Sequence, residues 1–131
     1  MQYACQVLGQ LGYSYGSPDL PHIEELAKAE AVPSNYLVQI LNELRTAGLI
    51  TSRRGKQGGY ALARAPEEIS LYEVMTAVEG EILAHSQGGK GASAARAEGV
   101  WQELARRVEA LLRDYSVKDF MAQAAGEMWY I

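Results

Sequence analysis

A short basic hairpin places the tightest constraint on the fold of this chain. The segment SRRGKQGGY, Ser52 to Tyr60, carries three cations and three glycines. It joins two runs with the short apolar pattern of strands, Leu49–Arg53 and Tyr60–Arg64. Glycine lets a backbone turn tightly and leaves it open to close approach. The sequence therefore predicts two strands and a positively charged tip over residues 54–59.

The residues before this hairpin predict a helix-turn-helix. Apolar side chains recur at three- and four-residue steps in three segments, Gln2–Tyr13, Leu20–Ala29 and Asn35–Ala47. Pro21 is expected near the start of the second helix and Ser34 is expected to cap the third, which Gly48 would end. A helix-turn-helix followed directly by a basic hairpin is the order of a winged helix, whose third helix can enter the DNA major groove.

The second half of the chain predicts further helices. Ser70 and Glu73 have the spacing of a capping box, which indicates a helix over Leu71–Val78. A glycine-rich loop, a long helix over Ala94–Tyr115 and a short helix over Val117–Gln123 are expected to follow. The fold class is thus mostly α with a small β-hairpin wing. We divide the chain into a winged helix-turn-helix (1–80), a flexible linker (81–93) and a dimerisation helix with a C-terminal tail (94–131).

The long helix has one apolar face that offers a dimer interface. Its members are Trp101, Leu104, Val108, Leu111, Leu112 and Tyr115. Such a face can pack on its own domain or on a second copy of the chain. Helix-turn-helix proteins commonly form dimers that read paired half-sites, which favours a homodimer.

The distribution of charge matters more than its total. The 131 residues carry a net charge of −4, which by itself argues against nucleic acid. Between Leu44 and Pro66, however, there is no Asp or Glu and there are five cations, at positions 45, 53, 54, 56 and 64. A solvated face and a DNA-binding patch are both open readings of this cluster. The single cysteine and the lack of any long apolar run favour a reducing, cytoplasmic location without a membrane span.

Three longer runs resemble one known family. They are YAC at Tyr3–Cys5, VPSNYLVQILNELRTAGLITSRRGKQGGYALAR at Val32–Arg64 and PEEISLYEVMTAVEG at Pro66–Gly80. Together with the helix around Trp101, they resemble the IscR/NsrR/CymR family of bacterial winged-helix transcription regulators, also called the Rrf-two family. The resemblance covers nearly the whole chain and implies a homodimeric DNA-binding regulator that acts as a repressor.

The resemblance also implies which residues face double-stranded DNA. In the third helix these are Ser34, Asn35, Tyr36, Val38 and Gln39, and in the wing they are Arg53, Arg54, Gly55, Lys56, Gln57, Gly58 and Gly59. Gln39 would bond base edges and Ser34 or Tyr36 a phosphate. Val38 departs from members that have an acidic residue there, because valine cannot accept a hydrogen bond from a cytosine amino group.

Cysteine usage departs from the cluster-binding members of the family. Those members carry three cysteines between the fourth and fifth helices, whereas Glu81–Glu98 contains none. Thiolates normally hold iron–sulfur clusters, and His85, the one imidazole there, cannot do so alone. We therefore expect no cofactor and no metal. Cys5 is interpreted as a structural thiol and His22 as a surface residue.

The signal that controls DNA binding is open at this stage, and two other classes of function are considered. A small molecule bound at Glu81–Ser93, a partner protein or a thiol change at Cys5 are possible signals. A protein-interaction module that has lost DNA binding is the alternative function, favoured by the acidic balance. An enzyme is not expected, because no catalytic motif is present.

Overall fold

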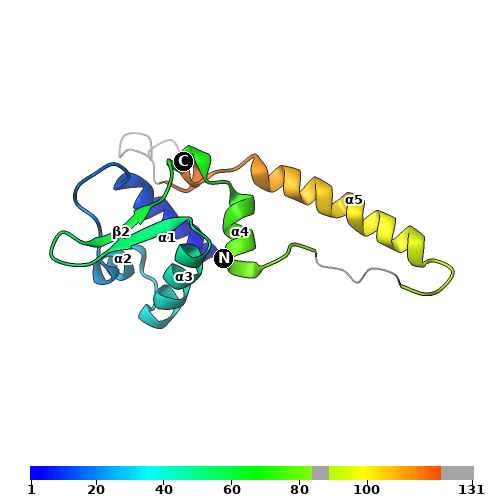
Figure 1. The fold of residues 1–131 in the computed structure, drawn as a ribbon, viewed down its shortest axis with the longest axis horizontal. Coiled ribbons are helices and arrows are strands. Elements are labelled where there is room, and N and C mark those ends of the chain that lie inside the picture. The colour runs from blue at the N-terminus through cyan, green and yellow to red at the C-terminus, as the bar shows by residue number, and fades with distance from the viewer. Residues whose placement is uncertain (84–88, 122–131) are drawn as a thin grey trace.

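The structure is a computed structural model that describes residues 1–83 and 89–121. Its order of elements is α1 (Gln2–Tyr13), α2 (Ile23–Glu30), α3 (Ser34–Thr46), β1 (Ile50–Arg53), β2 (Gly59–Leu62), η1 (Pro66–Glu68), α4 (Leu71–Glu79), α5 (Ala94–Arg113) and η2 (Val117–Phe120). The first four helices and the hairpin form a head, and α5 extends away from it (Figure 1). This arrangement confirms the predicted fold class of winged helix-turn-helix with a long C-terminal helix.

The core of the head lies where α1, α2, α3 and the hairpin meet. The helices contribute their apolar stripes, and Leu8, Leu37 and Val74 are completely buried. Truncating a buried leucine to alanine costs about 2–5 kcal/mol, so this core decides whether the head folds. The outer faces of α3 and the hairpin are left free of the core.

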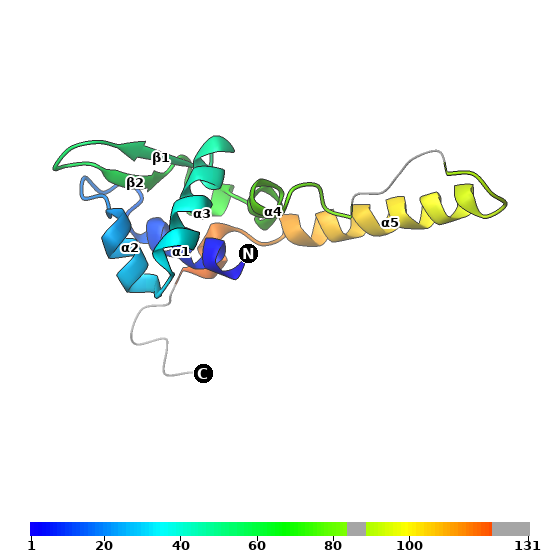
Figure 2. The ribbon, with the colours of Figure 1, turned by 90° about the horizontal axis from the view of Figure 1, so that it is seen from below.

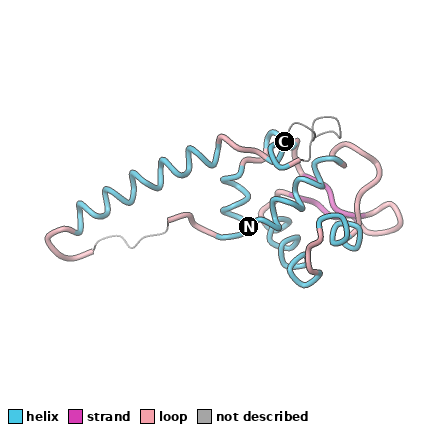
Figure 3. Tube along the Cα trace, turned by 180° about the vertical axis from the view of Figure 1, so that it is seen from behind, coloured by secondary structure: helices cyan, strands magenta, loops and turns pink. Residues whose placement is uncertain are grey.

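β1 and β2 form an antiparallel hairpin with Ile50 opposite Leu62 and Arg53 opposite Gly59. Figure 3 shows the two strands as the magenta pair. Ile50 and Leu62 are both buried, which attaches this end of the hairpin to the core. The opposite end projects as the wing, defined here as residues 53–59.

Two helix starts differ from the sequence prediction. The second helix begins at Ile23 rather than Leu20, because the Pro21 carbonyl accepts from the Tyr60 N–H at 2.9 Å and the chain turns into the helix only at His22. Ser34 was predicted as an N-cap but is the first helical residue. Pro33 occupies the cap position, since its carbonyl already accepts the Leu37 N–H at 3.0 Å.

The chain after α5 returns to the head. α5 ends at Arg113 rather than Tyr115, because the Tyr115 carbonyl accepts from Leu71 N–H at 2.8 Å and the Val117 N–H donates to Ile69 O at 3.0 Å. Val117 is fully buried in the core. The predicted final helix is the 3-10 turn η2 within the described residues.

η2 packs on α1 at a glycine. A Cβ at Gly9 would lie 2.5 Å from the carbonyl oxygen of Phe120, so the close approach of these two segments requires glycine. The C-terminal end of α5 is joined to the head through the segment 114–121, whereas its N-terminal end lies far from the head (Figure 2).

The predicted capping box of α4 is confirmed. Ser70 N–H donates to Glu73 Oε2 at 3.0 Å, and Glu73 N–H donates to Ser70 Oγ at 3.2 Å. Arg64, just after β2, donates to the other carboxylate oxygen of Glu73 and ties this segment to α4. Two parts of the sequence analysis, His85 with the centre of the linker and the tail beyond Met121, lie outside the described residues.

Candidate nucleic-acid interface

The outer face of α3 is exposed and polar. Leu37, Ile40, Leu41 and Leu44 point into the core, so the positions between them point to solvent. Four of the five residues predicted on this helix, Ser34, Asn35, Val38 and Gln39, are exposed at its N-terminal half. Tyr36, the fifth, is 53% exposed but lies on the flank, with its ring centroid 6.0 Å from that of Tyr3 on α1.

Gln39 has a neighbour that orients its amide. Its Nε2 donates to Glu43 Oε1 at 3.1 Å, one helical turn further along. The amide oxygen is then the group turned away from Glu43.

Two exposed residues on the same helix were missed by the sequence analysis as site residues. Asn42 and Arg45 continue the outer face of α3, and Arg45 donates to Asn42 Oδ1 at 3.2 Å and to Ser52 Oγ of β1 at 3.4 Å. The four- and three-residue steps from Val38 and Gln39 to Asn42, and the three-residue step from Asn42 to Arg45, were the signal that would have found them. Arg45 therefore connects the helix to the hairpin.

The wing presents its cations outward. Arg53, Arg54, Gly55, Lys56 and Gln57 are exposed, and the tip turns through Gly55, which has φ +98°. The Gly58 N–H closes the turn by donating to the Gly55 carbonyl at 2.9 Å.

Gly58 and Gly59 lie inside the wing rather than on its surface. Both are buried, and a Cβ at Gly58 would lie 2.2 Å from the Arg53 carbonyl oxygen. At Gly59 the backbone runs against Leu20 and Pro21 with φ +139°. These two glycines shape the hairpin, whereas the residues from Arg53 to Gln57 are free to contact a ligand.

Four cations of this region have no acidic partner in the part of the chain that the structure describes. Among the described residues, Arg64, Arg106, Arg107 and Arg113 form ion pairs with carboxylates, but Arg45, Arg53, Arg54 and Lys56 do not. Their charge is therefore not compensated by an ion pair with any carboxylate of the described residues. A surface with four unpaired cations next to an exposed helix face attracts polyanions.

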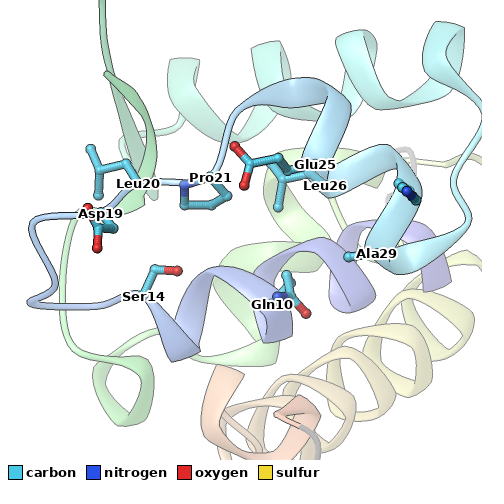
Figure 4. A pocket seen from close by; sticks show the side chains of 9 residues that line it. Gln10, Ser14, Asp19, Leu20, Pro21, Glu25, Leu26 and Ala29 are labelled. Atoms are coloured by element: carbon cyan, nitrogen blue, oxygen red, sulfur yellow. The ribbon is translucent and has the colours of Figure 1, made fainter. Parts of the chain in front are cut away.

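A hollow lies beside the loop between α1 and α2, whose Leu20 and Pro21 pack on Gly59. It has a volume of about 610 Å³ and lies between α1 and α2, with Gln10 and Ser14 on one side and Glu25, Leu26 and Ala29 on the other (Figure 4). Asp19, Leu20 and Pro21 close one end. Pro21 thus borders this hollow and also accepts a hydrogen bond from the Tyr60 N–H of β2.

The apolar face of α5 is largely uncovered. Trp101, Leu104, Leu111 and Tyr115 are exposed by 41–62%, and Val108 and Leu112 are partly covered. No residue of α5 is buried, and Val100, which the sequence analysis did not include, is 65% exposed. An apolar helix face of this length is typical of a surface that a partner covers.

The single thiol is half-buried in α1. Burial raises the pKa of Cys5, which the positive N-terminus lowers in part, so the net shift keeps the thiol protonated near neutral pH. The described residues hold no group of three His, Cys, Asp or Glu side chains suited to a metal. Of the helices within residues 1–83 and 89–121, none is both long and apolar enough to cross a bilayer.

Comparison with known proteins connects this surface to one family. Residues 1–123 match the profile of the family described as "Rrf2: Iron-dependent Transcriptional regulator". The regulator IscR of Cereibacter sphaeroides is 34% identical over 128 residues, which cover 92% of this chain and 83% of the relative.

Two solved structures have the same fold. T. potens IscR superposes with a TM-score of 0.70 at 26% identity, covering 98% of this chain and 92% of the other. CymR, described as the global cysteine regulator of B. subtilis, superposes with a TM-score of 0.72 at 25% identity, covering 90% and 89%.

Proposed function

The chain belongs to the Rrf2 family of DNA-binding transcriptional regulators, and from that premise we propose that it reads its operator with the outer face of α3 and the tip of the wing. Membership also confirms the prediction that the chain is a regulator and not an enzyme. The roles of individual residues, the dimer, the sign of regulation and the absence of a cluster belong to the proposal.

The observation that carries the proposal is the pairing of an exposed, mostly polar helix face with cations that form no ion pair among the described residues. Asn35, Val38 and Gln39 face outward from α3, and Arg54 stands on the wing beside it. A major groove about 12 Å wide admits a helix, and a glutamine amide can pair with an adenine edge there. Arginine at a wing tip suits a narrow minor groove, where the negative potential is enhanced.

Binding of the purified protein to its own upstream DNA tests the proposal. We expect binding that weakens steeply with salt, since each neutralised phosphate contributes a slope of about −0.9 in log K against log [salt]. Arg54→Ala should cost about 1–3 kcal/mol of binding free energy if Arg54 contacts bases. Arg106→Ala is the matched control, because it also removes one cation but lies on α5 in an ion pair with Glu103.

Substitution of Gln39 tests sequence reading separately. Gln39→Ala should reduce the difference in affinity between the operator and a scrambled duplex, while Arg106→Ala should leave that difference unchanged. Two results together would contradict the DNA interface: wild-type affinity that does not change with salt, and Arg54→Ala affinity equal to that of the wild type. They would favour a protein-interaction module.

We assign the exposed face of α5 to a homodimer. Covering Trp101, Leu104 and Leu111 with a second copy would remove apolar surface from water, at roughly 25 cal/mol per Å². Two heads joined through α5 would then read two half-sites. On this proposal, residues 1–80 are the reading head, 81–93 the linker, and 94–131 the dimer helix with its tail.

We also propose that the protein acts as a repressor in the cytoplasm. A dimer bound across a promoter occupies the DNA that RNA polymerase needs. A reporter fused to the upstream region should increase its expression when the gene for this chain is deleted. Decreased reporter expression in the deletion strain would instead show that the protein activates transcription.

We propose that the regulator works without an iron–sulfur cluster, although the family profile is described as iron-dependent. These 131 residues contain one cysteine, and it is half-buried in α1. Clusters are held by several thiolates, so these residues do not fit such a group. Protein purified without oxygen should carry less than one iron per chain and bind the operator equally well after chelation.

The signal is proposed to be a small molecule or a partner protein. Because the Cys5 thiol stays protonated, a thiolate-based sensor is disfavoured relative to the other two. The linker hypothesis can be tested by deletion of residues 84–88. If effector-dependent DNA binding is unchanged in that variant, the linker is not the effector site.

A further inference from the structure

The hollow between α1 and α2 has the size and the lining of a small-molecule site. Its volume of about 610 Å³ lies within the range of about 300–1,000 Å³ that ligand pockets usually have. Polar side chains border it from both helices, with Gln10 and Ser14 on α1 and Glu25 on α2 (Figure 4). Its apolar surface comes from Leu20, Pro21, Leu26 and Ala29. A ligand that fits it therefore has both apolar and polar parts.

The charged residues of the hollow are divided along α2. Glu25 lies in the first turn of the helix and Lys28 in the last, and both line the hollow. Asp19 adds a second carboxylate from the loop before α2, at the end of the hollow away from Ala29 (Figure 4). The hollow thus has an anionic end and a cationic end.

These charges do not neutralise one another. Residues three apart on a helix are neighbours, with about 5–6 Å between their Cβ atoms. Within residues 1–83 and 89–121, however, Asp19, Glu25 and Lys28 form no ion pair. Glu25 Oε1 instead accepts from the His22 N–H at 3.2 Å, which holds this carboxylate at the start of α2. On α5, by contrast, arginines pair with glutamates three or four residues away. A carboxylate and an ammonium group therefore stand ready side by side in the hollow.

The loop that closes the hollow also supports the wing. Leu20 and Pro21 border the hollow, and the Pro21 carbonyl accepts from the Tyr60 N–H at 2.9 Å. A Cβ at Gly59 would lie 2.7 Å from the Leu20 carbonyl oxygen, so the start of β2 lies directly against this loop. A ligand in contact with Leu20 and Pro21 restricts the motion of the loop and, through it, of the wing. DNA then binds a wing that is already ordered, which makes the two binding events cooperative.

A zwitterion matches the charges of the hollow. An α-amino acid carries its ammonium and carboxylate groups on one carbon atom, so it can meet Glu25 and Lys28 at the same time. Its ammonium group would donate to the carboxylates of Glu25 and Asp19, and its carboxylate would accept from Lys28. An apolar side chain would leave water against Leu20 and Pro21, which favours binding.

We propose that this hollow binds an apolar α-amino acid and that its occupancy tightens the binding of DNA. The inference rests on the proposed DNA interface and names an effector site and a ligand class for it. Because the coupling is reciprocal, bound DNA tightens the amino acid by the same factor.

Amide NMR of the full chain without DNA tests the site. The probes are L-leucine and L-phenylalanine, each titrated at constant pH and ionic strength. We expect saturable shifts of the amides of Ser14 and Glu25, and also of Tyr60, which lies outside the hollow and reports the loop. Absence of a saturable shift with both amino acids would overturn the proposal.

Two analogues of leucine test the need for both charges. Isocaproate lacks the ammonium group and isoamylamine lacks the carboxylate. Each should bind about fivefold more weakly than leucine, the factor that corresponds to an exposed ion pair of about 1 kcal/mol. Equal binding of either analogue would overturn the zwitterion.

Substitutions on α2 test the two ends of the hollow. Glu25→Gln can still accept from the His22 N–H but carries no charge, and Lys28→Gln removes the cation. Each should weaken leucine binding by about fivefold. Glu24→Gln is the matched control, because Glu24 occupies the same turn but does not line the hollow. Equal leucine affinities in all three variants would overturn the assignment.

Fluorescence anisotropy on labelled upstream DNA tests the coupling. Saturating leucine should tighten operator binding by the wild type by about fivefold or more, and by a smaller factor in the double variant Glu25→Gln, Lys28→Gln. Leucine that shifts the amides but leaves the operator affinity unchanged would overturn the coupling. Absence of salt-dependent operator binding by the wild type without leucine would instead overturn the proposed function, while the NMR titration still decides the amino-acid site.

Discussion

The attachment of the wing to the helix-turn-helix can be tested by Gly59→Ala. Gly59 begins β2 with φ +139°, a conformation that L side chains rarely adopt. A Cβ there would lie 2.6 Å from the Pro21 carbonyl oxygen and 2.7 Å from that of Leu20. Both oxygens belong to backbone and cannot rotate away, so the wing must separate from the loop.

The expected loss of stability has two sources. A non-glycine residue in such a backbone conformation costs about 1–3 kcal/mol. Separation of the wing also breaks the hydrogen bond from Tyr60 N–H to the Pro21 carbonyl, which contributes about 1 kcal/mol net. The variant should therefore lose about 2–4 kcal/mol, which a small domain with a stability of about 5–15 kcal/mol survives.

Gly48→Ala is the matched control for backbone strain alone. Gly48 has φ +78°, but no atom lies within 4 Å of the position of an added Cβ. This variant should lose about 1–2 kcal/mol, the cost of a left-handed conformation. The difference between the two variants then measures the contact between the wing and the loop.

Urea unfolding and amide exchange measure the two effects. With a denaturant slope of about 2 kcal/mol per molar, Gly59→Ala should lower the urea midpoint by about 1–2 M. The Tyr60 amide should lose its protection from hydrogen exchange in Gly59→Ala and keep it in Gly48→Ala. Equal midpoints for both variants, with Tyr60 still protected in each, would refute the argument that the loop supports the wing.

Three further predictions concern other parts of the molecule. Trp101→Ala should sediment as a folded monomer where the wild type is a dimer, and a fully dimeric variant would place the interface elsewhere. Burial raises the pKa of Glu73, but hydrogen bonds from Ser70 and Arg64 outweigh it and leave a net lowering. The lowered pKa stabilises the folded state. This stabilisation is fully present above the ordinary carboxyl pKa of about 4.3 and is lost as the pH falls through the lower pKa that Glu73 has in the folded protein. Urea midpoints at pH 3 and 6 should therefore differ more for the wild type than for Glu73→Gln. Cys5 should react with a disulfide reagent more slowly in native than in urea-unfolded protein, because burial raises its pKa, and equal rates would show an open thiol.

The elements of the fold were predictable where local pattern decides them. Gln2–Tyr13 was predicted with its observed bounds, because its apolar side chains keep a helical spacing throughout. The capping box at Ser70 and the positive φ at Gly48 were likewise predictable, because each depends on neighbouring residues alone. The predictions were wrong where a backbone group forms a hydrogen bond with a segment far away in the sequence. Leu20 and Pro21 were assigned to a helix, yet Pro21 bonds a strand about forty residues further along.

The sequence by itself determined a winged helix-turn-helix, its basic wing and the family to which the chain belongs, because periodicity, glycine placement and charge are local properties. Only the tertiary structure decided that Gly58 and Gly59 are internal, that Arg45 lies beside Arg53, and that the segment after α5 packs on Gly9. Those facts depend on which surfaces meet when the core closes. The basic surface is therefore a product of folding: its cations come from α3 and the hairpin, which lie side by side only once both have packed on the same core.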